Sequence, residues 1–228
     1  MNVTGITNLY RSFQTTAAAA VDPVQKAIEK ASTRLEDQKQ ATAVQLSAYG
    51  QVKAGFSRVE DAGKALAKID SLSATDTKKA LQSLVSAYND TRSAAASTSP
   101  GYAGNASNTL RRTASTDSMR SDLKSLGITQ KSDGSLAIDA KKLDHALASN
   151  PSTFRETASR VGGQLQQSAS RALSEGGGIS KTLNSLSAQA QQIGAQQSGL
   201  QGLTSAQQSL SSSDSAAGIS SYMRMFSL

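Results

Sequence analysis

The stretch that decides the fold is residues 22–72, DPVQKAIEKASTRLEDQKQATAVQLSAYGQVKAGFSRVEDAGKALAKIDSL. Its apolar residues recur with a mean spacing of about 3.5 residues, which is the period of a left-handed coiled coil. They are Val24, Ile28, Ala31, Leu35, Leu46, Tyr49, Val52, Phe56, Val59, Leu66 and Ile69, with Gln38, Thr42 and Gly63 in the remaining positions. We therefore expect one long helix that needs a helical partner along its whole length.

The start and length of this helix follow from the same stretch. Asp22 can cap the free amide groups of a first turn, and Pro23 is tolerated at the first helical position. A helix of about 50 residues is about 75 Å long, which exceeds the width of a compact domain of this size. The sequence therefore predicts an elongated molecule.

A second heptad pattern, in residues 179–210, predicts the antiparallel partner. Its apolar positions are Ile179, Leu183, Leu186, Ala190, Ile193, Leu200, Leu203 and Leu210. The preceding Gly176–Gly178 lacks the Lys-Ser/Thr of a phosphate-binding loop at the required spacing, so we interpret it as a hinge between antiparallel helices. The fold class is mainly α: an elongated antiparallel coiled coil or helical bundle.

Between the two heptad segments, the sequence predicts helices over about 75–96 and 106–126 and then a small β-hairpin near 128–139. Further helices begin after Asp139 and at Asn150–Pro151. The hairpin and the adjoining helix ends depend on nine residues: Gly127, Ile128, Asp133, Gly134, Leu136, Ile138, Asp139, Asn150 and Pro151. We divide the chain into an N-terminal segment (1–20), a helical domain (21–213) and a C-terminal tail (214–228).

Both ends of the chain carry an apolar stripe with i, i+3, i+4, i+7 spacing. The stripes are Ile6, Leu9, Tyr10 and Phe13, and Ile219, Tyr222, Met223 and Phe226. One interpretation is that these stripes pair with each other or with neighbouring molecules and become ordered on assembly. The other is that both ends are disordered tails in the monomer.

Composition argues against several classes of function. The 228 residues include no cysteine and one histidine, His145, so we predict no catalytic residues, no metal site and no cofactor. The net charge is +7, but the basic residues alternate with acidic ones, which favours a solvated helical face over nucleic-acid binding. We expect no membrane span, and if the protein leaves the cell, we expect a route that does not cleave a Sec-type leader.

The hairpin region carries a dense set of residues at fixed spacing. They are Leu123-Lys124-Ser125-Leu126-Gly127-Ile128, Asp133-Gly134-Ser135-Leu136-Ala137-Ile138-Asp139, Lys142-Leu143, Ala146-Leu147 and Asn150-Pro151. This set resembles a motif of flagellar filament cap proteins, also called hook-associated protein 2. Upstream, Leu84-Val85-Ser86-Ala87-Tyr88-Asn89 is similar to the F-V-x-x-Y-N helix of that family. The resemblance covers about residues 22–186.

The resemblance implies a structural, extracellular component of the bacterial flagellum. It implies docking on axial subunits (flagellin or hook-junction proteins), self-association into a homo-oligomer, type III export and an export chaperone as a further partner. One departure is large: the family's β-rich plate is missing, because only residues 71–77 join the N-terminal rod to the F-V-x-x-Y-N-like helix. The alternative is a soluble helical adaptor or regulator of flagellar assembly that reuses the leg of the cap.

Overall fold

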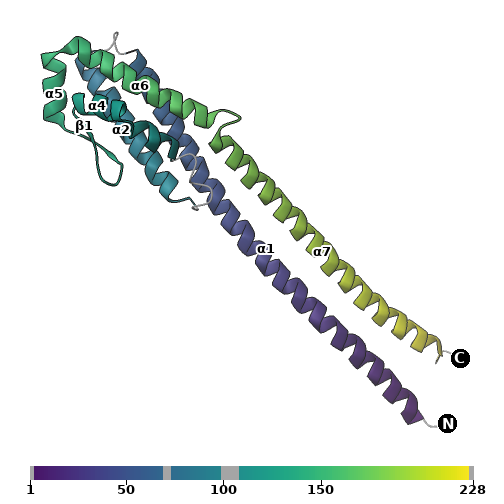
Figure 1. Cartoon of the computed structure of the whole chain (residues 1–228). Coiled ribbons are helices and arrows are strands. Elements are labelled where there is room, and N and C mark those ends of the chain that lie inside the picture. Colours follow the sequence, from purple (N-terminus) through teal and green to yellow (C-terminus); the bar gives the residue numbers. More distant parts are fainter. Residues whose placement is uncertain (1–2, 69–72, 99–107, 226–228) are drawn as a thin grey trace. The chain divides into compact units, whose positions relative to one another are not determined.

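The chain is mainly helical, with one small antiparallel hairpin, as the sequence predicts (Figure 1). This computed structural model describes the backbone of residues 3–68, 73–98 and 108–225, and within these ranges the side chains of 25–206, 208 and 209. The elements are α1 (Val3–Ala67), α2 (Ala74–Ala96), a helical segment at 108–114, α4 (Asp117–Ser125), β1 (Ile128–Gln130), β2 (Leu136–Ile138), α5 (Ala140–Ser149), α6 (Pro151–Leu173) and α7 (Gly178–Met225).

These elements form two units. The larger unit is residues 43–187, and the smaller unit combines residues 1–42 with 188–228. Helices α1 and α7 each contribute to both units. The boundaries that we predicted at residues 20 and 213 stay predictions.

Helix α1 begins earlier than the sequence predicts. It runs without interruption from Val3 to Ala67, so the expected helix start at Asp22 is wrong. The stretch Ala17–Ala20 precedes the capping signal and consists of the strongest helix-forming residue. Pro23 therefore lies inside the helix, where it removes one backbone hydrogen bond.

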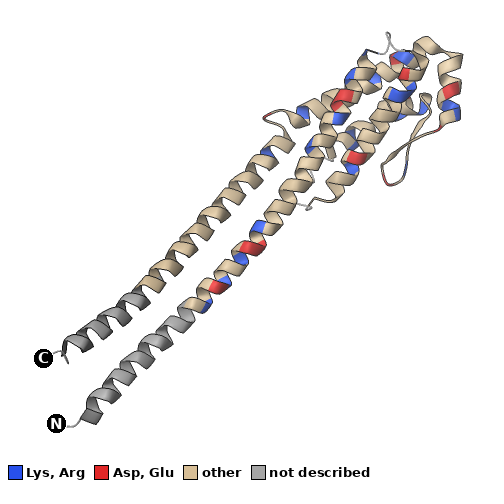
Figure 2. Cartoon of the chain, turned by 180° about the vertical axis from the view of Figure 1, so that it is seen from behind, with Lys and Arg blue, Asp and Glu red and all other residues tan. Residues whose placement is uncertain are grey.

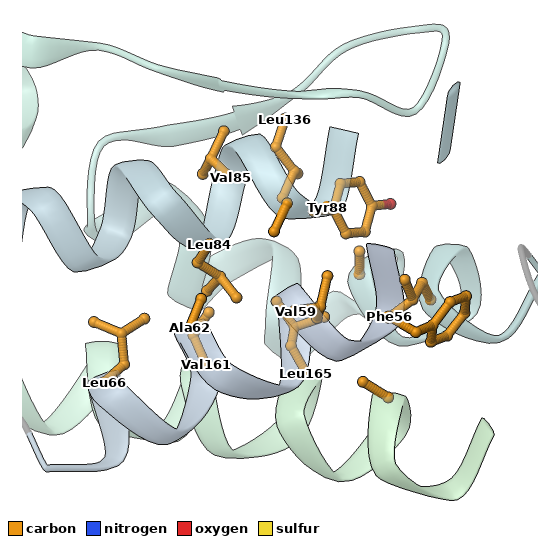
Figure 3. Close-up of a cluster of buried hydrophobic side chains, with 14 of the residues drawn as sticks. Phe56, Val59, Ala62, Leu66, Leu84, Val85, Tyr88, Leu136, Val161 and Leu165 are labelled. Carbon is orange, nitrogen blue, oxygen red and sulfur yellow. The ribbon is translucent and has the colours of Figure 1, made fainter. Parts of the chain in front are cut away.

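The core of the larger unit surrounds the second half of α1, which lies between α2 and α6 (Figure 3). Helix α1 contributes Phe56, Val59 and Leu66, each fully buried, as their heptad positions predict. The neighbouring elements contribute Leu84, Val85 and Tyr88 from α2, Leu136 from β2, and Val161 and Leu165 from α6. Small residues on α1 let both neighbouring helices approach it closely.

Two glycines mark a close approach of α1 to α6. A Cβ atom at Gly63 would lie 2.6 Å from the Gly162 carbonyl oxygen, and one at Gly162 would lie 2.6 Å from the Leu66 Cβ. On the α2 side, a Cβ at Gly55 would lie 2.5 Å from the Thr91 Oγ1. Real Cβ atoms do not approach other atoms so closely, so these helix pairs need glycine at the contact.

Two sequence predictions for this unit are wrong. The helix expected over 106–126 is broken, because Thr116 leaves the helical conformation and its side chain accepts the Met119 N–H as the cap of α4. Gly176–Gly178 does not join antiparallel helices either. Helix α6 meets α1 near Gly63, and α7 meets it near Tyr49 through Thr182, so α6 and α7 follow one another along α1.

The adjacent glycines of α6 give a matched stability test. Gly162→Ala should destabilise the protein by about 1–3 kcal/mol, because the methyl group overlaps Leu66. Gly163→Ala should instead stabilise it by up to about 1 kcal/mol, because nothing lies within 4 Å of its Cβ position and alanine favours the helix. Urea unfolding followed by circular dichroism measures both. Equal stability of the two variants would contradict this helix packing.

Candidate functional site

The β-hairpin pairs Ile128 with Ile138 and Gln130 with Leu136. Its loop is closed by two backbone bonds, Gly134 N–H to the Lys131 carbonyl and Lys131 N–H to the Ser135 carbonyl, both 2.8 Å long. Gly134 has a φ of 83°, so the left-handed conformation expected of the Asp-Gly turn is present. This arrangement is a three-residue loop with a bulge at the glycine.

Asp133 holds this loop through Ser135. Its Oδ1 accepts the Ser135 hydroxyl at 2.7 Å and the Ser135 backbone N–H at 2.8 Å. These two bonds favour the charged carboxylate and lower the pKa of Asp133, with a smaller contribution from the Arg92 guanidinium. Asp133 is thus a turn residue, as predicted, and does not form a pair of carboxylates with Asp139.

Gly127 ends the helix before the hairpin. Leu126 is the C-cap of α4, and Gly127 follows it with a φ of 77°, as the sequence predicts. A Cβ at Gly127 would lie 2.7 Å from the Leu143 backbone nitrogen, so glycine also lets α5 approach. The Gly127 carbonyl accepts the Asp139 N–H at 2.8 Å, which fixes the return of the chain after β2.

The predicted helix caps are confirmed. The Asp139 Oδ1 accepts the Lys142 N–H at 3.2 Å and starts α5, and this bond is the main cause that lowers the pKa of Asp139. Asn150 accepts the Thr153 N–H at 3.3 Å and starts α6, with Pro151 in the first turn. Each cap satisfies a backbone amide that has no partner inside its helix.

The hairpin packs its apolar side into the core. Ile128 and Leu136 are buried, and Ile138 is half-buried against the same cluster. This burial stabilises the two short strands, because an isolated hairpin has only marginal stability in water.

Helix α2 also binds the hairpin through polar groups. The Asn89 side chain donates to the Leu136 carbonyl at 2.8 Å and accepts the Leu136 N–H at 2.9 Å, so one amide satisfies both backbone groups. Tyr88 donates its hydroxyl to the Gly134 carbonyl at 3.3 Å. Burial raises the pKa of Tyr88, so it stays a neutral donor. The Tyr-Asn pair was part of the resemblance, but sequence reasoning gave it no role.

An ion pair fastens α4 to α6. Arg160 donates from Nε and Nη2 to the two carboxylate oxygens of Asp122, at 2.8 and 2.9 Å. Such two-fold contacts fix the relative orientation of the two groups. Sequence reasoning missed this pair, because its members lie 38 residues apart and neither has a motif.

The smaller unit pairs residues 25–42 of α1 with residues 188–206 of α7, which run side by side (Figures 1 and 2). Gln197 of α7 donates to the Glu36 carboxylate at 2.9 Å. Thr42 and Ile193 are buried, whereas Ile28, Ala31, Leu35, Ala190 and Leu200 are only half-buried. The heptad prediction is thus confirmed for most of the described contact line.

Two heptad positions are wrong. Gln38 is exposed, and Leu203 keeps 59% of its surface exposed. The contact line continues from Ile193 through Gln197 and Leu200 to Thr204, so Leu203 falls beside it. Leu46, also predicted in the contact line, is half-buried in the larger unit, where Leu186 is buried.

The predicted partner-contact residues lie outside the described side chains. They are Ile6, Leu9, Tyr10, Phe13, Ile219, Tyr222, Met223 and Phe226. Their contact role therefore stays a prediction.

The described residues hold no group of three or more His, Asp or Glu side chains that could bind a metal ion. His145 is exposed on α5, where its Nδ1 lies 3.3 Å from the Ser149 Oγ. Among the described residues, no helix has a long enough apolar stretch to cross a membrane. The features that organise the site are thus turns, caps and helix contacts.

Comparison with known proteins adds one match. Residues 101–213 match a family described as flagellar hook-associated protein 2 C-terminus. The matched range includes α4, the hairpin, α5, α6 and much of α7. Neither a curated protein nor a solved structure matches the chain.

The two bonds of Asn89 can be separated by substitution. Asn89→Ala should expose the hairpin amides to hydrogen exchange and cost about 1–3 kcal/mol, because the buried Leu136 backbone loses both partners. Asn89→Asp keeps an acceptor for the Leu136 N–H but loses the donor to its carbonyl, so it should fall between wild type and Asn89→Ala. Native-state hydrogen exchange measures the effect. Unchanged protection in Asn89→Ala would refute the role of this amide.

A titration tests the turn. Ser135→Ala removes the hydroxyl that contributes most to the lowered pKa of Asp133, so this pKa should rise towards its ordinary value. The lowered pKa means that the Asp133 bonds stabilise the fold above the ordinary pKa of the carboxyl. That stabilisation is lost as the pH falls through the lowered value. Carbon NMR titration measures it, with Asp139 as the control that should not change.

Proposed function

Because this chain belongs to the flagellar hook-associated protein 2 family, we propose that it docks on axial subunits at the end of the flagellar filament and associates with copies of itself. The observation that carries the proposal is the family match over residues 101–213. The axial partners would be flagellin or hook-junction proteins. The proposed location is the extracellular part of the bacterial flagellum.

The larger unit supports a scaffold role in this proposal. Helix α1 is fixed on two sides by glycine contacts, and the hairpin is fixed by the Asn89 amide. The Arg160–Asp122 pair connects two further helices. A unit held by such contacts can transmit load between subunits without changing shape, as a filament component must.

The smaller unit supports the docking role. Its two described helix segments leave Ile28, Leu35 and Leu200 only half-buried, so further apolar surface can be covered by a partner. The stripes at the two chain ends would extend this surface. These ends would lose conformational entropy when they become ordered at assembly, and contacts with neighbouring subunits would offset that loss.

The connection between α1 and α2 supports a short form of the cap. Helix α1 ends at Ala67 and α2 begins at Ala74, which leaves residues 68–73 between them. The resemblance places a β-rich plate at this point in other members. In this proposal the protein therefore provides the leg of a cap without the plate, and its role is structural rather than enzymatic.

Cell fractionation tests the location. Filaments are sheared from the cells, and the protein is detected with an antibody in the filament, medium and cytoplasmic fractions. We expect it on the sheared filaments. Retention in the cytoplasm would instead favour a regulator of flagellar assembly, which is the other function that the sequence left open.

The stripes at the chain ends give a matched test of docking. Phe13→Asp or Phe226→Asp should reduce the amount of protein on sheared filaments at least about tenfold, since a carboxylate would be buried in an apolar contact. Ser12→Asp, which lies off the N-terminal stripe, is the control and should leave it unchanged. Circular dichroism of the purified variants should show equal helicity. If both Phe variants docked as well as wild type, the stripes would not be part of the docking interface.

A further inference from the structure

The tip of the β-hairpin, between β1 and β2 in Figure 1, holds a chemically sensitive pair of residues. Asp133–Gly134 is the only Asp-Gly pair in the 228 residues, and the chain contains no Asn-Gly pair. In such a pair the backbone nitrogen of the glycine can attack the aspartate carboxyl, because glycine has no Cβ to hinder the approach. The Asp133 side chain keeps 63% of its surface exposed, so water reaches it. The hairpin tip therefore has the groups that isoaspartate formation requires.

This rearrangement takes place in two steps and uses only water. First the Gly134 nitrogen bonds to the Asp133 Cγ, and one carboxyl oxygen leaves as water with the carboxyl proton and the amide proton. The resulting five-membered ring then takes up one water. When this water breaks the bond between the Asp133 carbonyl carbon and the Gly134 nitrogen, the main chain runs through the Asp133 side chain. A carboxylate is then left on the Asp133 Cα.

The folded hairpin restrains both reacting groups. The Gly134 N–H donates to the Lys131 carbonyl at 2.8 Å, so the attacking nitrogen is engaged. The Asp133 Oδ1 accepts the Ser135 hydroxyl at 2.7 Å and the Ser135 N–H at 2.8 Å, so the carboxyl group is not free to turn. The lowered pKa of Asp133 acts in the same direction, because an ionised carboxyl is a poor acceptor for a nucleophile.

We propose that Asp133 is a site of isoaspartate formation, and that Ser135 holds its carboxyl in an unreactive arrangement in the folded protein. The reaction then proceeds from molecules in which the exposed tip has opened locally, which requires less free energy than global unfolding. The modified residue therefore accumulates with the age of the molecule. This inference concerns the chemistry of the turn and does not depend on the proposed function.

The modification changes the hairpin itself. The main chain gains one carbon atom within the loop, and the carboxylate that Ser135 binds moves to the Asp133 Cα. The loop and the Ser135 contacts cannot both keep their geometry after this change. Asn89 binds the backbone of Leu136, which directly follows Ser135, so the change reaches the contact between α2 and the hairpin. Old molecules should therefore hold the hairpin less firmly.

Peptide mapping of the full-length protein tests the site. The protein is kept near neutral pH for several weeks, either folded or unfolded in guanidinium chloride, and is then digested. Electron-transfer fragmentation distinguishes isoaspartate from aspartate, which have the same mass. Unfolded protein should form isoaspartate at Asp133, and folded wild type should do so at least about tenfold more slowly. Asp139, which is followed by Ala140, is the internal control and should react much more slowly than Asp133 in unfolded protein.

Three variants test the role of Ser135. Ser135→Ala removes the hydroxyl and should raise the rate at Asp133 at least about threefold in folded protein. Ser135→Thr keeps a hydroxyl and should stay close to wild type. Ser132→Ala removes an exposed hydroxyl on the other side of Asp133 and is the matched control, with an unchanged rate. In guanidinium chloride all four proteins should react at similar rates, because the contact is then absent.

Three results would overturn the inference. No isoaspartate at Asp133 in unfolded protein would remove the site, and equal rates in folded wild type and Ser135→Ala would remove the role of Ser135. Hydrogen exchange of the paired Ile128 and Ile138 amides should be unchanged in Ser135→Ala. A general loss of protection there would assign the faster reaction to an opened hairpin instead of the lost contact. None of these results depends on docking to the filament.

Discussion

The larger unit depends on the close packing of one half of α1 between α2 and α6. Phe56, Val59 and Leu66 are fully buried there, and the glycine contact between Gly63 and Gly162 sets how near α6 can come. A chain without tryptophan and with few aromatic residues cannot build a thick core, so it stabilises helices by letting their backbones approach. The other elements of this unit are placed on the resulting three-helix frame.

The hairpin is held in place by apolar and polar contacts together. Ile128 and Leu136 place its apolar side in the core, and the Asn89 amide takes up both polar groups of Leu136. A buried backbone group without a partner would cost as much as several apolar contacts provide. The dense sequence pattern around the Asp-Gly turn thus reflects two demands at once: the two left-handed glycines that the chain path requires, and full pairing of the buried backbone.

Sequence reasoning succeeded where the cause of a feature is local or periodic. The Asp-Gly turn, the Asp139 and Asn150 caps and the buried positions of α1 follow from residues a few positions apart. It failed where the role of a residue depends on a partner that is distant in the sequence, as for Asn89 and for the Arg160–Asp122 pair. The spacing of residues along the chain does not predict such contacts. It also failed at Asp22–Pro23, where a good capping signal is overridden by the helix-forming residues before it.

The contrast between the units bears on how such a chain can function. In the larger unit the same 3.5-residue period gives fully buried positions at Phe56, Val59 and Leu66, because two helices, α2 and α6, pack against α1 there. In the smaller unit Ile28, Leu35 and Leu200 stay half-buried, because each helix has a single described neighbour. The period alone therefore does not set burial; the number of helices around the contact line does. A segment with an incomplete helical environment has more to gain from another subunit than a segment whose core is complete, and this favours the smaller unit for the assembly contacts that we propose.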